Sequence, residues 1–457
     1  MTTPTRDIDE SAPRIRNKRE LVERLAGGSK PASQWRIGTE HEKFGFIEKT
    51  LRPLPYDGPA SVRKLLEGFE KFGWSPIIEG DHIIGGKKDG ASLSLEPGGQ
   101  FELSGAPLET IHETCKEISD HLRETRSIAE PMGVEFLALG FSPIWSLEET
   151  PMMPKGRYGI MKAYMERVGR LGRQMMFRSC TVQSNLDFGS EADMVKKMRV
   201  SLALQPIATA LFANSPFAEN RTNGYQSYRS HVWTDTDPDR TGMLPFAFEE
   251  GFGFEQYVDY ALDVPMYFVR RDGKYLDCSG LSFRDFMAGK LPTLPGEKPA
   301  MDDFDDHIST IFPEVRLKTF LEMRGADAGP QTKLCALSAF WAGILYDQVA
   351  LDSAWELVKG WTTAERQALR SAVPMLGLKA PIRNTTAHKV AKDVLAIAHR
   401  GLSRRNKLNG SGENETIFIT ELQEIAESGL NPAERLLEKY HGPWKRDLRH
   451  AFKEVRF

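Results

Sequence analysis

Cysteine is scarce in this chain. Its 457 residues include four cysteines, Cys115, Cys180, Cys278 and Cys335, which lie far apart and form no CxxC pair. The spacings of zinc sites and of dithiol redox motifs are therefore absent. A chain of this length buries a core large enough to need no disulfide staples. From composition alone we expect four inert thiols in a reducing compartment.

Long apolar runs and an excess of charge are also missing. No run approaches the roughly 20 residues of a membrane span, and residues 1–10 contain no apolar signal segment. The 60 Lys and Arg nearly balance the 63 Asp and Glu, giving a formal net charge of −3. Such a balance attracts neither nucleic acid nor an acidic membrane. These features predict a cytoplasmic protein with no nucleic-acid partner and no membrane partner.

Several familiar binding motifs fail on inspection. Gly80 and Gly85 have the spacing of a P-loop, but Gly86 follows where a lysine is required. Residues 235–240 have the acidic spacing of a calcium loop, with an arginine in place of its glycine. No GxGxxG and no HExxH is present. A P-loop, a Rossmann cofactor site, an EF-hand and a zincin are therefore unsupported.

The most informative feature that is present is the pair Glu40 and Glu42 within Arg36–Phe46. Residues two apart on a strand point to the same face, so both carboxylates would share one face. An isolated E-x-E pair has a plainer interpretation, two solvent-facing acids. Ile37, Phe44 and Phe46 indicate a buried strand instead, where unpaired acids are costly.

The same-face pattern recurs in three later segments. Its members are Glu96 with Gln100 and Glu102, then Gln183 with Asn185 and Asp187, and then Glu322 with Arg324. A sheet whose concave face carries so many acids repels itself unless cations bind there. Hard divalent cations prefer oxygen ligands, and Mg²⁺ with a nucleotide polyphosphate is a common use of such a site. The residues therefore predict a metal–nucleotide site.

Three arginines permit two interpretations each. Arg229 is either a clamp for a carboxylate or a surface residue. Arg178 and Arg324 lie on or beside the acidic strands. Each would either neutralise the neighbouring acids or stabilise a phosphoryl group during transfer.

The apolar spacing predicts an α+β fold. We expect a flexible segment at 1–17 and a single domain at 18–457, in which 18–333 form the catalytic sheet with helices and 334–457 form a helical part packed on it. Strands are expected at 77–104 and 174–188, mixed strand and turn at 257–275, and a loop at 404–415. Helices are expected at 18–25, 62–72, 107–132, 158–172, 192–214, 334–349, 362–373, 386–400, 418–428 and 432–440.

Longer motifs then point to one family. They are residues 36–46, 95–104, 153–158, 175–178, 185–188, 202–217, 231–244 and 312–326. Together they resemble glutamate–cysteine ligase of the plant and alphaproteobacterial type, from about Trp35 to the C-terminus. The resemblance implies an antiparallel sheet curved into a funnel, as in the catalytic domain of glutamine synthetase. It implies the first step of glutathione synthesis, in which ATP and Mg²⁺ support the ligation of L-glutamate to L-cysteine.

The resemblance also implies roles for single residues. Two or three Mg²⁺ ions would bind Glu40, Glu42, Glu96, Glu102 and Glu322. Gln183, Asn185 and Arg324 would contact ATP. Arg324 and Arg178 would act on the phosphates in catalysis, and Arg229 would hold the glutamate α-carboxylate with Trp233 nearby.

Other implications of the resemblance stay open at this point. Cys278 matches one member of a regulatory cysteine pair of plant relatives, but Thr293 stands in place of the second. Cys115 and Cys335 match another pair, whose bridge depends on a distance that the sequence does not contain. Feedback by glutathione and the choice between monomer and homodimer are also open. The alternatives are a ligase that uses another amine and a silent binding protein on the same fold.

Overall fold

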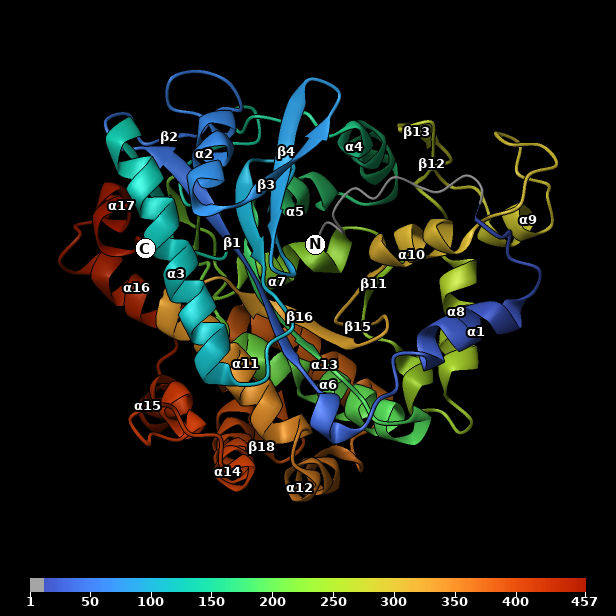
Figure 1. Cartoon of the computed structure of the whole chain (residues 1–457). Helices are drawn as coiled ribbons and strands as arrows, with labels where there is room; N and C mark the ends of the chain where they lie inside the picture. The colour runs from blue at the N-terminus through green and yellow to red at the C-terminus, as the bar shows by residue number, and fades with distance from the viewer. Residues whose placement is uncertain (1–11) are drawn as a thin grey trace.

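The computed structural model describes residues 12–457, which fold around one antiparallel sheet (Figure 1). β1 (Ile37–Ile47) lies near its middle, and two further strands, β2 (Arg52–Pro53) and β7 (Val134–Leu137), also pair with β1. The strand order is β15 (Val315–Leu317), β16 (Leu321–Asp327), β8 (Thr181–Leu186), β1, β6 (Gln100–Ser104), β5 (Ala91–Leu95), β4 (His82–Lys88) and β3 (Ser75–Glu79). The predicted antiparallel acidic sheet is confirmed.

Helices surround this sheet, and the C-terminal ones gather on one side of it (Figure 1). They are α1 (Lys18–Ala26), α2 (Val62–Phe69), α3 (Ile111–Ala129), α4 (Gly156–Val168), α5 (Gly172–Arg178), α6 (Glu191–Phe212), α7 (Tyr228–Val232), α8 (Phe254–Asp263), α9 (Phe283–Met287), α10 (Met301–Ser309), α11 (Gln331–Leu345), α12 (Gln348–Val358), α13 (Thr363–Leu376), α14 (Ala387–Arg405), α15 (Thr420–Ser428), α16 (Pro432–His441) and α17 (Ala451–Glu454). Short ladders complete the fold, namely β9 (Phe217–Ala218) with β10 (Arg221–Thr222), β11 (Thr241–Gly242) with β14 (Phe312–Pro313), β12 (Phe268–Arg271) with β13 (Lys274–Asp277), and β17 (Pro381–Ile382) with β18 (Thr385–Thr386). From α11, which begins at Gln331, the chain is mainly helical.

The two faces of β1 have different neighbours, as the alternation of side chains on a strand requires. On one face, Thr39 shares a 2.5 Å hydrogen bond with Ser338 of α11. Further along that face, Lys43 Nζ lies 2.8 Å from Nε2 of His121 on α3. Helices α3 and α11 thus cover this face, and the opposite face is left for Glu40 and Glu42.

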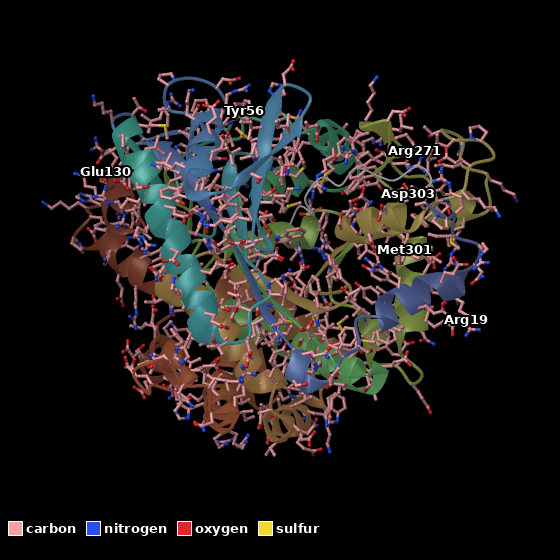
Figure 2. All side chains as sticks on the ribbon, in the orientation of Figure 1. Arg19, Tyr56, Glu130, Arg271, Met301 and Asp303 are labelled. Atoms are coloured by element: carbon pink, nitrogen blue, oxygen red, sulfur yellow. A yellow bond between two sulfur atoms is a disulfide. The ribbon has the colours of Figure 1, made fainter. Side chains whose placement is uncertain are left out.

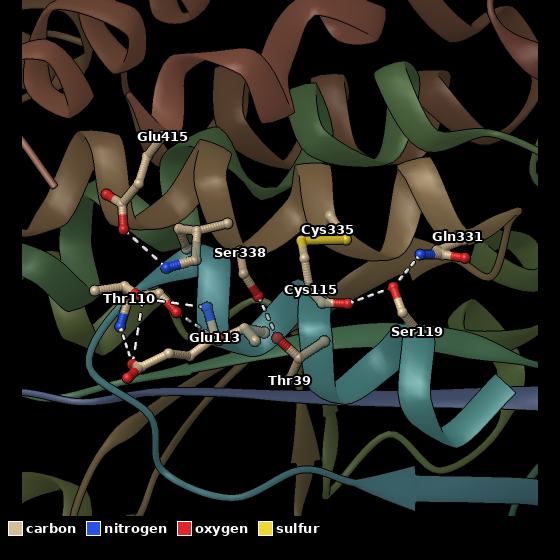
Figure 3. Close-up of a disulfide and its surroundings, with 11 residues drawn as sticks. Thr39, Thr110, Glu113, Cys115, Ser119, Gln331, Cys335, Ser338 and Glu415 are labelled. Atoms are coloured by element: carbon tan, nitrogen blue, oxygen red, sulfur yellow. Dashed lines mark hydrogen bonds between the residues drawn. A yellow bond between two sulfur atoms is a disulfide. The ribbon is translucent and has the colours of Figure 1, made fainter. Parts of the chain in front are cut away.

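A disulfide joins the two covering helices (Figure 3). It links Cys115 on α3 to Cys335 on α11, with Cα atoms 5.5 Å apart and 220 residues apart in sequence. The expectation of four inert thiols is therefore wrong for this pair, because the fold brings together two helices that the sequence separates. Cys180 and Cys278 are free and buried, and Thr293 hydrogen-bonds to Cys278.

Two other expectations are corrected. Residues 172–178 form α5 rather than the start of a strand, since a short apolar run does not distinguish the two. Residues 254–263 form α8, whose buried Tyr257, Val258, Ala261 and Leu262 have helical spacing. The mixture of strand and turn expected at 257–275 is therefore found only in its second part, which contains β12 and the start of β13.

The predicted flexible segment lies partly outside the described residues. Residues 1–11 are not described. Ile15 is 2% exposed, and its N–H donates to the Pro299 carbonyl at 2.8 Å. Arg14 forms a bridge with Ala300, so residues 14 and 15 are fixed against the loop before α10 rather than free.

The β12–β13 hairpin is anchored to α10 by a forked ion pair. Arg271 donates through Nη1 and Nη2 to the two carboxylate oxygens of Asp303, at 2.8 and 3.0 Å (Figure 2).

Within residues 12–457, no single helix is long and apolar enough to cross a bilayer. Helices α11 and α12 pass that test only when joined, and they meet at an 89° bend.

Candidate active site

Two cavities meet the face of the sheet that carries the paired glutamates. The wide cavity has a volume of about 770 Å³ and is lined in part by Arg36, Glu40, Lys88, Asn185, Asp187 and Lys318. The narrow cavity has a volume of about 60 Å³ and is lined in part by Glu42, Glu96, Gln183, Arg229, Trp233 and Arg324. Glu40 and Glu42 are two residues apart, about 7 Å along a strand. β1 therefore carries one carboxylate to each cavity.

The strand register places one glutamate directly opposite another. Glu42 on β1 faces Glu102 on β6, and Glu40 faces Gln183 on β8. Burial, together with the Glu96 charge, raises the pKa of Glu42 to about 7. Burial and the nearby Glu96, Glu40 and Glu42 raise the pKa of Glu102 well above its usual range. Lys155 and Arg157 lie close enough to Glu96 to help lower its pKa despite burial, whereas the pKa values of Glu42 and Glu102 stay raised.

The turn between β5 and β6 directs Glu96 toward the narrow cavity. Gly99 has a φ of +83°, and a Cβ on Gly98 would lie 2.1 Å from the Phe177 carbonyl of α5. Only glycine fits such a close approach. The Gly98 N–H donates to Oε1 of Gln100 at 2.9 Å, which holds the turn closed. The tight turn is thus a consequence of backbone packing against α5.

Several oxygens at the site have no hydrogen-bond partner. They are Glu40 Oε2, Glu96 Oε1, Glu102 Oε2 and Asn185 Oδ1. Buried polar atoms without partners are uncommon and call for a ligand or an ion. Within residues 12–457, no three His, Cys, Asp or Glu side chains form a closed metal-binding group. Mg²⁺ commonly takes one or two carboxylates and completes its shell with water and phosphates, so these oxygens suit that ion.

Glu322 differs from the other predicted metal ligands. Its Oε1 accepts from Arg316 Nη2 at 2.9 Å and from Arg324 Nη1, and its Oε2 lies 3.5 Å from Lys318 Nζ. Burial would raise its pKa, but Arg316, Lys318 and Arg324 outweigh burial and hold the pKa well below its usual range. Glu322 is already neutralised by the protein, so it orients arginines and is the weakest of the five metal-ligand candidates.

Arg324, Gln183 and Asn185 lie on the acidic face, as predicted. Arg324 donates from Nη1 to Gln183 Oε1 at 2.8 Å, which fixes the guanidinium at the wall of the narrow cavity. Asn185 donates to Glu40 Oε1 at 2.6 Å and lines the wide cavity. The two amide residues therefore serve different cavities.

Arg229 and Trp233 lie together at the narrow cavity, on α7 and on the turn after it. Arg229 donates to the Arg324 carbonyl at 3.0 Å and is 3% exposed. The interpretation of Arg229 as a surface arginine is therefore wrong. Asp327, absent from the predicted set, accepts from Ser215 Oγ at 2.6 Å and Ser227 Oγ at 2.7 Å and so fixes the start of α7.

The placement of Arg178 does not match its predicted catalytic role. Its Nη1 donates to Gln174 at 2.8 Å and to Glu219 at 2.9 Å, and its guanidinium lies over the Phe141 ring. Of the described residues that line the wide and narrow cavities, Arg178 is not one. The helix α5 turns this side chain away from the site, where a strand at 174–188 would have placed it on the sheet.

Three residues of α4 and its N-cap were missed as site residues. Lys155 donates to Ser94 Oγ at 2.8 Å and to the Leu95 carbonyl at 3.2 Å, and burial with the Arg157 charge lowers its pKa to about 7. Tyr158 also donates to Leu95. Arg157 and Tyr158 line the narrow cavity. The only signal for them was their place in a family motif at 153–158, since a loop-to-helix junction has no periodic pattern.

Met176 and Tyr257, two side chains that could contact the thiol of a cysteine substrate, lie in different parts of the structure. Met176 lines the narrow cavity. Tyr257 belongs to the core, where its hydroxyl accepts from the Leu317 N–H at 3.0 Å. Met176 therefore stays a candidate, and Tyr257 does not.

The fold belongs to a class built on a large antiparallel sheet with flanking helices, which is also the fold of a glutamate–cysteine ligase of known structure. Among solved structures, the chain is similar to a glutamate–cysteine ligase of Francisella tularensis in complex with AMP, with a TM-score of 0.55, 12% identity and coverage of 92% of this chain and 88% of that one. A bifunctional glutathione synthetase of Pasteurella multocida gives a TM-score of 0.51 at 12% identity, covering 94% of this chain and 53% of that one. At such identities the likeness shows the fold alone.

Sequence comparison then identifies the family. The model of glutamate–cysteine ligase family 2 matches residues 36–454. The chloroplastic glutamate–cysteine ligase of Medicago truncatula is 57% identical over 439 residues, covering 96% of this chain and 85% of the relative. The Nicotiana tabacum enzyme is 57% identical over 453 residues, covering 99% and 85%. The chain belongs to the glutamate–cysteine ligase family 2, and it is a ligase.

The predicted cytoplasmic location is contradicted. The relatives from Medicago truncatula, Nicotiana tabacum and Arabidopsis thaliana are all named as chloroplastic enzymes. The expectation rested on residues 1–10, which contain no apolar signal segment, and that feature does not determine where the enzyme works.

Proposed function

We propose that this ligase joins the γ-carboxylate of L-glutamate to the amine of L-cysteine at the expense of ATP, giving γ-glutamylcysteine, the first step of glutathione synthesis. One observation carries the proposal. The paired carboxylates of β1 connect a nucleotide-sized cavity to an arginine-lined cavity, and neighbouring carboxylate oxygens there have no partner.

ATP fits the wide cavity, whose volume lies in the usual range of ligand sites, about 300–1,000 Å³. Lys88 and Lys318 line it and would neutralise phosphate charge. Burial, with the Arg316 charge, lowers the pKa of Lys318 to about 8, so at neutral pH this amine is still mostly protonated. The γ-phosphate would then lie toward Glu40 and Glu42.

Glutamate fits the narrow cavity with its α-carboxylate on Arg229 and its γ-carboxylate toward β1. At about 60 Å³ the narrow cavity is smaller than an amino acid, so we expect lining side chains such as Met176 and Trp233 to move when substrate binds. A forked guanidinium is suited to a planar carboxylate. Met176 and Tyr158 would border the cysteine.

Two or three Mg²⁺ ions would be held by Glu40, Glu42, Glu96 and Glu102, with Glu322 in a supporting place. When bound, they would neutralise the phosphates and polarise the γ-phosphoryl group. The open oxygens of Glu40, Glu96 and Glu102 supply the donor chemistry that such ions prefer.

The reaction would proceed in two steps. A γ-carboxylate oxygen of glutamate attacks the γ-phosphorus of ATP, the bond to the β–γ bridging oxygen breaks, and γ-glutamyl phosphate and ADP result. The amine of cysteine then attacks the acyl carbon, and the amide forms as phosphate leaves with the C–O bond electrons. The amine's proton passes to phosphate or solvent. Arg324, held by Gln183 and Glu322, faces the transferring phosphoryl group and stabilises its charge.

The first test is ADP release by the purified chain with Mg²⁺, ATP and glutamate, with and without cysteine. We expect release that depends on cysteine and a product with the mass of γ-glutamylcysteine. If cysteine had no effect on ADP release but 2-aminobutyrate or another amine stimulated it, the acyl-phosphate mechanism would stand. Cysteine would then be rejected as the acceptor. No release with any amine would reject the proposal in favour of a silent protein.

A further inference from the structure

A third, much smaller cavity adjoins the narrow cavity on the side away from β1. Its volume is about 20 Å³, and it shares Arg229, Trp233 and Arg324 with the narrow cavity. Its outer wall includes Arg370 of α13, a helix of the C-terminal part of the chain. A volume of about 10–15 Å³ is enough for one water-sized group, so this space holds one such group.

Three buried donors at this small cavity have no hydrogen-bond partner. They are Arg229 Nε, Trp233 Nε1 and Arg370 Nη1. Arg229 is 3% exposed and Arg370 is 5% exposed. A buried donor without an acceptor costs about 1–3 kcal/mol, and more when it is charged. Three such donors around one small space indicate a missing acceptor.

Hydrogen bonds fix the Arg370 guanidinium and leave its Nη1 without a partner. Its Nε donates to Glu314 Oε1 at 2.8 Å, and its Nη2 donates to the Ser230 carbonyl at 3.2 Å. The Ser230 carbonyl belongs to α7, which also carries Arg229. The guanidinium is thus fixed against α7, with Nη1 free for a ligand.

The small cavity is lined by more positive than negative side chains, which favours binding of an anion. Arg229, Arg324 and Arg370 line it together with one acid, Glu314. An anionic acceptor would be bound by charge-assisted hydrogen bonds, which are roughly twice as strong as neutral ones. A carboxylate has two oxygens on one carbon, so one oxygen can enter the small cavity while the other stays in the narrow cavity.

We infer that the small cavity is the seat of the substrate α-carboxylate, and that Arg370 is a further glutamate-binding residue acting with Arg229 and Trp233. The inference rests on the proposed function, because that function places glutamate in the narrow cavity. It makes the C-terminal helical part a contributor to substrate selection rather than a support for the sheet.

The test compares two ligands on three proteins. L-glutamate and L-isoglutamine differ at the α-carbon, where isoglutamine has an amide in place of the carboxylate and keeps the γ-carboxylate. Calorimetric Kd values and kcat/KM values are measured for wild type, Arg370→Lys and the control Arg366→Lys. Arg366 is a buried arginine one helical turn earlier on α13 and donates to the Trp361 carbonyl.

We expect wild type to prefer glutamate strongly and Arg370→Lys to lose about tenfold to hundredfold of that preference, the usual range for one charged hydrogen bond. The loss should appear in Kd and KM for glutamate, with KM for ATP unchanged. Arg366→Lys should keep the preference of wild type. Arg370→Gln serves as a second variant, and melting curves identify any variant that fails to fold.

An equal loss for glutamate and isoglutamine in the Arg370 variants would overturn the inference and make Arg370 a structural residue that holds α7. If the Arg370 variants kept the wild-type preference for glutamate over isoglutamine, the inference would also be overturned, and the small cavity would be assigned to a bound water. If wild type binds glutamate but turns over no amine, the proposed function fails, and the Kd ratios still decide the role of Arg370. If wild type binds no glutamate, both fail.

Discussion

Two fully buried glutamates of one sheet have opposite electrostatic surroundings. Glu322 on β16 and Glu102 on β6 are each 0% exposed. Arg316, Lys318 and Arg324 surround Glu322 and hold its pKa well below the usual range. Glu102 accepts a 3.1 Å hydrogen bond from Ser104 Oγ, and burial with the neighbouring acids raises its pKa well above the usual range.

The difference shows that burial of an acid does not by itself indicate a metal site. At the β15–β16 edge the protein supplies the countercharge, and the acid positions arginines. Around Glu42, Glu96 and Glu102 the Lys155 and Arg157 charges help lower the pKa of Glu96, but the pKa values of Glu42 and Glu102 stay raised, and three carboxylate oxygens of Glu40, Glu96 and Glu102 have no hydrogen-bond partner. A cation from outside is therefore expected on the Glu102 side, since paired ions are stable in the interior only when each charge is compensated.

The largest effect is expected from Glu322→Gln. The change leaves Arg316 and Arg324 buried without their anion, and breaking a buried ion pair costs about 3–5 kcal/mol of unfolding free energy. Urea denaturation of the metal-free protein measures it. Glu102→Gln is the matched comparison and should change the unfolding free energy by about 1 kcal/mol or less, because burial and the neighbouring acids disfavour the charged form of Glu102 and glutamine resembles the uncharged form. If Glu322→Gln and Glu102→Gln lowered the unfolding free energy equally, the two glutamates would not differ in their electrostatic surroundings as described.

The next effect is on catalysis. Glu42→Gln should lower kcat by about 100-fold or more at saturating Mg²⁺, since it removes a ligand charge next to the phosphoryl group. Circular dichroism should show an unchanged fold. Steady-state ADP release against Mg²⁺ concentration gives kcat. A kcat near the wild-type value would reject Glu42 as a metal ligand.

The disulfide behind β1 should contribute somewhat less. Cys115→Ser should lower the unfolding free energy by about 2–4 kcal/mol under non-reducing conditions, because the bridge closes a long loop in the unfolded chain. Denaturant titration measures the loss. With reductant present, wild type and variant should agree. A variant as stable as oxidised wild type would show that the bridge is not formed in solution.

The smallest effect is a pH dependence, best seen as a difference between two proteins. Burial and Glu96 raise the pKa of Glu42 to about 7, from 4.5 for an ordinary glutamate. Between these pH values the unfolded chain releases the Glu42 proton before the folded one does, so wild type should lose unfolding free energy relative to Glu42→Gln as pH rises. The unfolding free energy that wild type loses relative to Glu42→Gln should total at most about 3 kcal/mol. The loss should level off above pH 7.

Denaturation of both proteins without metal at pH steps from 4 to 8 checks this sign. Taking the difference cancels the opposite contribution of buried histidines such as His41 and His121, whose pKa values burial lowers. Mg²⁺ should reverse the trend by binding the ionised form. Glu48→Gln, an exposed position one residue past β1, is the control. If the difference in unfolding free energy between wild type and Glu42→Gln did not change with pH, Glu42 would ionise as readily in the folded protein as in the unfolded chain.

Much of the fold could be read from local patterns. Period-two alternation placed Glu40 and Glu42 on one face of β1, because the geometry of a strand determines it. Apolar spacing located most helices of the C-terminal part. The pattern failed at 172–178 and 254–263, where short apolar or aromatic runs suit either element and tertiary packing decided for a helix.

The candidate site was less predictable. The acids and the arginine pair Arg229 and Arg324 could be named, but Lys155 and Arg157 lie at a helix start without a pattern. Arg370 lies more than a hundred residues from Arg229 and reaches it only because α13 packs on α7. Arg178 was assigned to the site and points elsewhere.

By itself, the sequence determined the strand alternation, the acidic face and the family, since these depend on local geometry and on motif identity. Only the tertiary structure decided which cation neighbours each buried carboxylate, which cysteines pair, and which arginines reach the cavities. The physical reason is that pKa, ion pairing and bridging depend on distances between side chains, and long-range packing sets those distances.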